Sequence, residues 1–82
     1  MSEKEIFDKV VKILGPYVRN EAGLKDIEHK TNIVTDLQVN SSRLVDIILA
    51  MEDEFDIEIA DEEADKVETV GAAVNLIKGK IG

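Results

Sequence analysis

Three polar residues in a row, Asn40-Ser41-Ser42, stand directly ahead of an apolar stretch and are the part of the chain best suited to chemistry. Each is of a type that caps helices, yet one helix end needs only one such cap. A phosphate ester on Ser41 would meet unpaired backbone N–H groups and the positive end of the helix dipole. We therefore interpret Ser41 as a point of covalent attachment, with ordinary helix capping as the alternative.

The other side chains offer little for catalysis. His29 is the only histidine, the chain has no Cys, and no base near Ser41 in the sequence could activate it as a nucleophile. Residues 53–65 are rich in acid but lack the glycine at the sixth loop position of an EF-hand, so weak divalent-cation binding stays open without a dedicated metal site. We expect neither enzyme activity nor a metal centre.

Length and charge limit the classes of partner. The 82 residues predict one domain, 1–82, and the formal net charge of −8 argues against nucleic acid and against an anionic membrane surface. It suits a partner with a basic patch, or simply an acidic soluble protein. The longest unbroken apolar run, Ile47 to Met51, is too short to span a bilayer, and the charged start resembles no signal peptide. We expect a cytoplasmic monomer.

Periodicity predicts the elements that position Ser41. Ser2 and Glu5 fit a capping box, and the apolar residues that follow have helical spacing up to a break near 14–18, where Gly15 precedes Pro16. Residues 19–40 show no steady period, which predicts a long loop with at most a helical turn near 25–29. A short helix is expected over 61–65, and Thr69 is the expected cap of a last helix.

The helix predicted over 41–55 has two apolar faces. One arc is the expected core face and contains Leu44, Ile47, Ile48, Met51 and Phe55. Val45 and Leu49 lie outside this arc, beside Ser42 and among Asp46, Glu52 and Asp53. A strip of this kind indicates contact with a partner protein, although isolated exposed aliphatic residues are also common.

From Asn32 to Ile77 the sequence resembles the acyl carrier proteins. Their signature, aspartate-leucine-glycine-x-aspartate-serine-leucine, aligns with residues 36–42, and the acid-rich segment 50–59 and the segment 61–70 match the end of their second helix and their third helix with the following cap. The resemblance implies an all-α fold, a small four-helix bundle of three main helices and one short third helix, with a long loop between helices one and two.

The resemblance also implies a function. Ser41 would carry 4′-phosphopantetheine, transferred from coenzyme A by a phosphopantetheinyl transferase, and the arm would hold acyl or related cargo as a thioester. The cargo could enter the apolar interior of the bundle. Acyl-loading and acyl-processing enzymes with basic surfaces would dock on the second helix, at Ser42, Val45, Asp46, Leu49, Glu52 and Asp53.

Several residues depart from the family signature. Gln38 replaces a glycine, Asn40 an aspartate, Ser42 a leucine and Arg43 a frequent acid. Since these changes surround Ser41, they indicate a specialised carrier rather than one that serves general fatty acid synthesis. A competing hypothesis is an acidic helical interaction module in which Ser41 only caps a helix.

Overall fold

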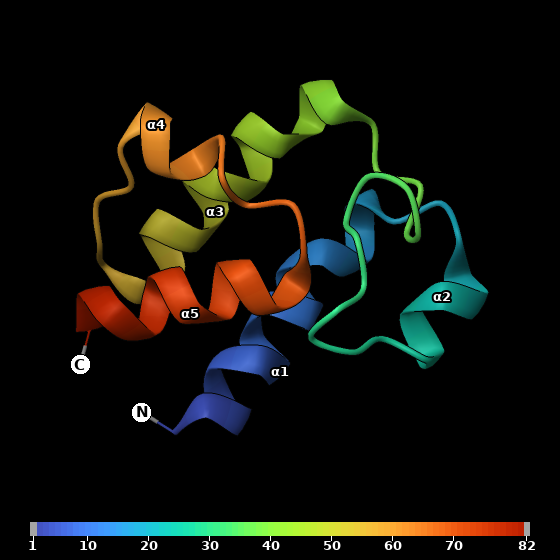
Figure 1. The fold of residues 1–82 in the computed structure, drawn as a ribbon, viewed down its shortest axis with the longest axis horizontal. Coiled ribbons are helices and arrows are strands. Elements are labelled where there is room, and N and C mark those ends of the chain that lie inside the picture. The colour runs from blue at the N-terminus through green and yellow to red at the C-terminus, as the bar shows by residue number, and fades with distance from the viewer. Residues whose placement is uncertain (1, 82) are drawn as a thin grey trace.

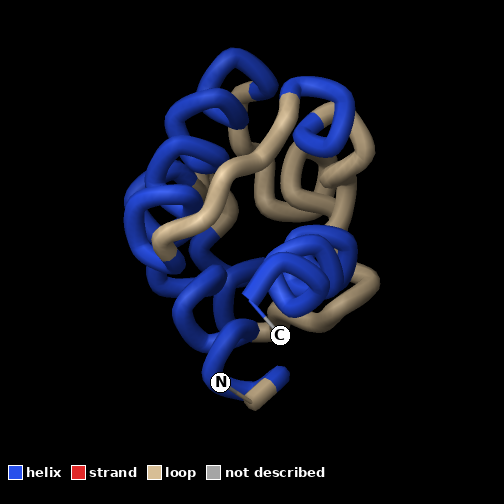
Figure 2. Tube along the Cα trace, turned by 90° about the vertical axis from the view of Figure 1, so that its left-hand side faces the viewer, coloured by secondary structure: helices blue, strands red, loops and turns tan. Residues whose placement is uncertain are grey.

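Three long helices frame the protein. The computed structural model describes residues 2–81, apart from the side chains of Glu21 and Leu24. The long helices are α1 (Glu3–Leu14), α3 (Leu44–Phe55) and α5 (Val70–Ile81), and α1 packs against both of the others (Figure 1). The short elements are α2 (Glu21–Lys25), α4 (Asp61–Ala64) and the 3-10 segments η1 (Gly15–Tyr17) and η2 (Ser41–Arg43). No β-strand forms within residues 2–81, so Figure 2 shows helix and loop alone, and the all-α prediction is confirmed.

The predicted helical faces form one aliphatic core. On α1, Ile6, Val10 and Leu14 are fully buried, and Ser2 caps the helix by accepting a hydrogen bond from the Glu5 N–H at 3.2 Å. The core face of α3 is buried as expected, except that Leu44 at its first turn is only partly buried. The buried residues of the three long helices are Ile6, Val10, Leu14, Ile47, Ile48, Met51, Phe55, Val70, Ala73, Val74 and Ile77.

The segment between α1 and α3 differs from the prediction in one element. The helical turn expected near 25–29 is wrong, because the helix lies earlier, over Glu21–Lys25. The Asn20 side chain sets its start by accepting a hydrogen bond from the Gly23 N–H at 3.2 Å. The same side chain donates to the Asp36 carbonyl at 2.9 Å, so α2 is fastened to the loop that precedes Ser41.

The long loop is held against the beginning of α5. The Ile33 N–H donates to the Glu68 carbonyl at 3.0 Å, and the Val70 N–H donates to the Thr31 carbonyl at 3.0 Å. The Gly71 N–H donates to the His29 carbonyl at 2.7 Å, and a side chain at Gly71 would place its Cβ only 2.8 Å from that oxygen. Glycine is therefore required at this close approach. Thr69, the predicted cap, accepts the Ala72 N–H at 3.1 Å.

Candidate functional site

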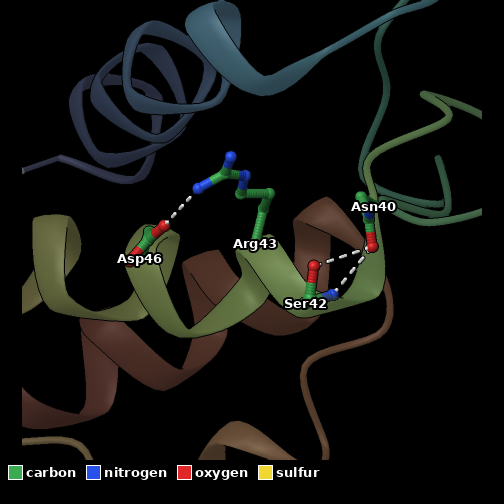
Figure 3. A network of polar contacts seen from close by, with 4 residues as sticks. All are labelled: Asn40, Ser42, Arg43 and Asp46. Atoms are coloured by element: carbon green, nitrogen blue, oxygen red, sulfur yellow. Dashed lines mark hydrogen bonds and ion pairs between the residues drawn. The ribbon is translucent and has the colours of Figure 1, made fainter.

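Asn40, rather than Ser41, caps the helix that follows. Its side-chain oxygen accepts the Ser42 N–H at 3.0 Å and the Ser42 hydroxyl at 2.9 Å (Figure 3). Its carbonyl accepts the Arg43 N–H at 2.8 Å. Two of the three cap-type residues are thus engaged with each other. Ser41 is exposed, and within the described part of the chain its hydroxyl has no hydrogen-bond partner. The interpretation of Ser41 as a cap fails on this geometry.

The backbone N–H groups at the helix start are not unpaired, contrary to the expectation from the sequence for a phosphate on Ser41. The N–H groups of Ser42 and Arg43 are occupied by Asn40, and the Leu44 N–H donates to the Ser41 carbonyl. A phosphate on Ser41 would therefore gain from the dipole of η2 and α3 but not from free donors at these three residues. The expectation of unpaired N–H groups is wrong there, because the tight 3-10 turn uses them internally.

Ser41 lies on the wall of an apolar cleft. The cleft has a volume of about 540 Å³ and lies between α3, α4 and the loop segment 32–35. Leu44, Ile48 and Leu49 line it from α3, and Ala64 lines it from α4. Because Ser41 belongs to the same lining, a flexible group attached to its hydroxyl could enter the cleft directly. This arrangement suits an attachment point with a storage space beside it.

The outer strip of α3 is confirmed as an exposed apolar surface. Val45 is 64% exposed and Leu49 57% exposed, the highest values among large apolar residues in the described ranges. Both side chains also line the cleft, so the strip forms its outer edge. The other residues predicted to contact partners lie on the same helix or immediately before it: Ser42 and Asp53 are exposed, and Asp46 and Glu52 are half-buried.

An ion pair lies beside this strip. Arg43 Nη1 is 3.3 Å from Asp46 Oδ2, and the side chains are 62% and 46% exposed, respectively (Figure 3). The sequence reasoning did not identify this pair, although a base and an acid three residues apart at a helix start are the pattern that produces one. It also missed Ala64 and Val67 as lining residues of the cleft. No periodic pattern marks them, because their position depends on how α4 packs against α3.

A second polar network fastens α4, the far wall of the cleft. Glu63 Oε1 accepts hydrogen bonds from Lys80 Nζ at 2.9 Å and from the Ala60 N–H at 3.0 Å. These two donors, with Lys80 the stronger, hold the pKa of the Glu63 carboxyl below its ordinary value. The network joins α4 to the last turn of α5 and so keeps the cleft wall in place.

His29 has a structural position. Its ring stacks on Phe7 of α1, with centroids 4.9 Å apart and 15° between the planes. Within residues 2–81, no three His, Cys, Asp or Glu side chains gather in a way that could hold a metal ion. No helix over these residues is long and apolar enough to cross a membrane.

The chain is similar to known proteins over nearly its whole length. A family described as "Phosphopantetheine attachment site" matches residues 17–77. The acyl carrier protein of Lactobacillus acidophilus is 44% identical over 82 residues, all of both chains, and that of Picosynechococcus sp. is 39% identical over 79 residues, covering 96% of this chain and 95% of the relative.

The fold has a solved counterpart. The structure of the acyl carrier protein from Enterococcus faecalis, described for its high thermal stability, aligns with a TM-score of 0.79 at 39% identity, covering 96% of this chain and 98% of that one. The four-helix arrangement predicted from the resemblance is confirmed, with α2 as an additional short helix within the long loop. The chain therefore belongs to the acyl carrier protein family and is a carrier that bears covalently attached 4′-phosphopantetheine.

Proposed function

We propose that Ser41 is the residue that carries the arm. The observation that supports this best is the division of roles among the three polar residues: Asn40 caps the helix, Ser42 bonds to Asn40, and Ser41 is exposed without a partner. The exposed hydroxyl and the adjoining cleft fit a long flexible group. When bound, the arm supplies a thiol on which acyl cargo is held as a thioester.

Attachment requires a separate enzyme. The Ser41 Oγ–phosphorus bond forms as the pyrophosphate linkage of coenzyme A breaks, adenosine 3′,5′-bisphosphate leaves, and the hydroxyl proton passes to the transferase. The chain itself contributes an accessible hydroxyl at the start of a helix, and no base lies near it in sequence. We infer that the protein is a substrate presented to enzymes, without catalysis of its own.

The cleft is the proposed place for the cargo. Its lining is mainly aliphatic, from Ile33 and Val34 on the loop side to Ile59 and Val67 near α4. An acyl chain enclosed there is removed from water, which is favourable by roughly 0.8 kcal/mol for each buried methylene group. Partner enzymes must draw the chain out again, so the cleft must remain open at the strip of Val45 and Leu49.

The α3 face is the proposed docking surface for those enzymes. It joins an apolar strip to acidic side chains that basic partner surfaces attract, and attraction of this kind raises association rates. The residues of this docking face are Ser42, Val45, Asp46, Leu49, Glu52 and Asp53. The departures from the family signature around Ser41 support a specialised cargo or pathway. We further propose that the carrier is a monomer and acts in the cytoplasm.

Intact-mass spectrometry tests the attachment site. The apo protein is incubated with coenzyme A and a broad-specificity phosphopantetheinyl transferase, beside Ser41→Ala and the matched control Ser42→Ala. We expect the wild type and Ser42→Ala to gain one arm each, and Ser41→Ala to gain none while it unfolds at an unchanged temperature. Modification of Ser41→Ala would refute the proposal, as would an unmodified wild type under conditions that fully modify a known carrier.

A further inference from the structure

Arg43, in η2 directly before α3, adds a base to the edge of the docking face. Arg43 is the only Lys or Arg between Lys30 and Lys66, in a stretch otherwise rich in acid. Its side chain is 62% exposed and belongs to the turn that Ser41 begins. Its guanidinium pairs with Asp46 at 3.3 Å and so offsets the acid closest to Ser41 on α3 (Figure 3).

The opposite end of the face keeps a free negative charge. Asp53 follows Asp46 by two helical turns, about 10 Å along the same side of α3. It is exposed, and no ion pair involves it among residues 2–81. Along α3, the Arg43–Asp46 pair therefore offsets charge at the end near Ser41, whereas Asp53 leaves the far end negative. The lining of the cleft also includes Asp61, Asp65 and Glu68.

Arg43 is available to a partner. Ion pairs between exposed side chains contribute little to stability, because water and salt screen them and both side chains lose freedom. The guanidinium can thus exchange Asp46 for another carboxylate at small cost. A guanidinium binds a carboxylate through two parallel N–H donors, which gives such a contact directional specificity.

We propose that this face selects partner enzymes whose docking surface has mixed charge. Such a surface offers an apolar socket for Val45 and Leu49, a carboxylate opposite Arg43 beside the entrance for the arm, and a base opposite Asp53. A uniformly basic surface sets a positive group against Arg43 and is disfavoured by like-charge repulsion. The inference rests on the proposed docking role of α3.

The test measures docking apart from modification. Every variant is made in the Ser41→Ala background, and dissociation constants are measured by calorimetry without coenzyme A. The first probe is a phosphopantetheinyl transferase with a uniformly basic docking face. The second is the same enzyme with Glu in place of the base nearest its active-site entrance. We expect Arg43→Glu to bind the basic probe about tenfold more tightly and the Glu-bearing probe about tenfold more weakly than the parent.

Two control variants separate the possible failures. Lys4→Glu makes the same charge change in the first turn of α1, at the opposite end of the molecule from η2, and should alter neither constant more than twofold (Figure 1). Leu49→Gln should weaken binding to both probes. The inference is supported if Arg43→Glu binds the basic probe more tightly and the Glu-bearing probe more weakly than the parent, while Leu49→Gln binds both probes more weakly. If Arg43→Glu changes neither dissociation constant more than Lys4→Glu does, the inference is overturned. If Leu49→Gln also leaves both dissociation constants unchanged, the proposed docking role of α3 is overturned as well.

Discussion

Gln38 shows at the scale of one residue why the family signature has glycine at its position. Its φ of 55° lies in the left-handed region, where a side chain crowds the backbone. The residue stands between the buried Leu37 and Val39, so the surrounding packing holds it in this conformation. The sequence shows the departure from glycine, but only the backbone shows that it introduces strain three residues ahead of Ser41.

Replacing Gln38 with Gly should therefore stabilise the protein. Relief of left-handed strain exceeds the entropy cost of glycine, and we expect a net gain of about 0.5–1 kcal/mol in the free energy of unfolding. Urea denaturation followed by circular dichroism measures it. Thr35→Gly, at an exposed loop residue with negative φ, is the control and should destabilise. A Gln38→Gly variant no more stable than the wild type would show that no strain is stored there.

The candidate site was predictable from sequence only where periodicity or residue type decides it. The exposure of Val45 and Leu49 follows from helical spacing, and the capping ability of Asn40 follows from its side chain. The cleft was not predictable in this way, because its walls come from α3, α4 and a loop that meet only after packing.

At the scale of elements, the predictions succeeded where the sequence shows a helical period or an acidic first turn, as in the four-residue α4. The long helices show their faces over three turns, whereas α2 has five residues and contains Gly23, so it has no period to detect. Its start depends on a side-chain contact of Asn20, and its fastening depends on the distant Asp36. The prediction placed this turn too late for that reason.

The link between α4 and α5 should make stability depend on pH. The pKa of Glu63 is lower in the folded state than its ordinary value of 4.5. The ionised carboxylate therefore stabilises the fold above pH 4.5, and this stabilisation is lost as the pH falls through the folded-state pKa. Glu63→Gln should lower the melting temperature at pH 7, and this difference should shrink and then vanish as the pH falls below the ordinary value and through the lowered pKa of the folded state. The exposed neighbour Glu62, changed to Gln, is the control. A difference for Glu63→Gln that persists unchanged in acid would contradict the assignment.

At the scale of the whole molecule, acidic side chains outnumber basic ones, 18 to 10. The formal net charge is −8, and acids are dense over residues 52–68, where Lys66 is the only base. Self-repulsion of this kind weakens the folded state at low ionic strength. Only a fraction of it is relieved by the exposed pairs Lys9–Glu54, Lys30–Glu28 and Arg43–Asp46.

Salt should consequently stabilise the fold. Raising sodium chloride from about 10 to 200 mM shortens the Debye length from about 30 Å to below 10 Å, and we expect a gain of about 1 kcal/mol, or about 4–8 °C in melting temperature. Differential scanning calorimetry measures it, with magnesium chloride compared at equal ionic strength. A melting temperature indifferent to both salts would argue against strong repulsion, and a response to magnesium alone would indicate a specific cation site.

The attachment of the loop 29–33 to residues 68–71 has a consequence for protein synthesis. The chain is made from its N-terminus, so Ser41 is translated well before the backbone groups of Glu68 and Val70 that hold the preceding loop. We expect the loop and its serine to adopt their final geometry only when α5 has formed. A transferase that recognises this geometry would then modify finished chains and ignore nascent ones, so an incomplete product would not consume coenzyme A.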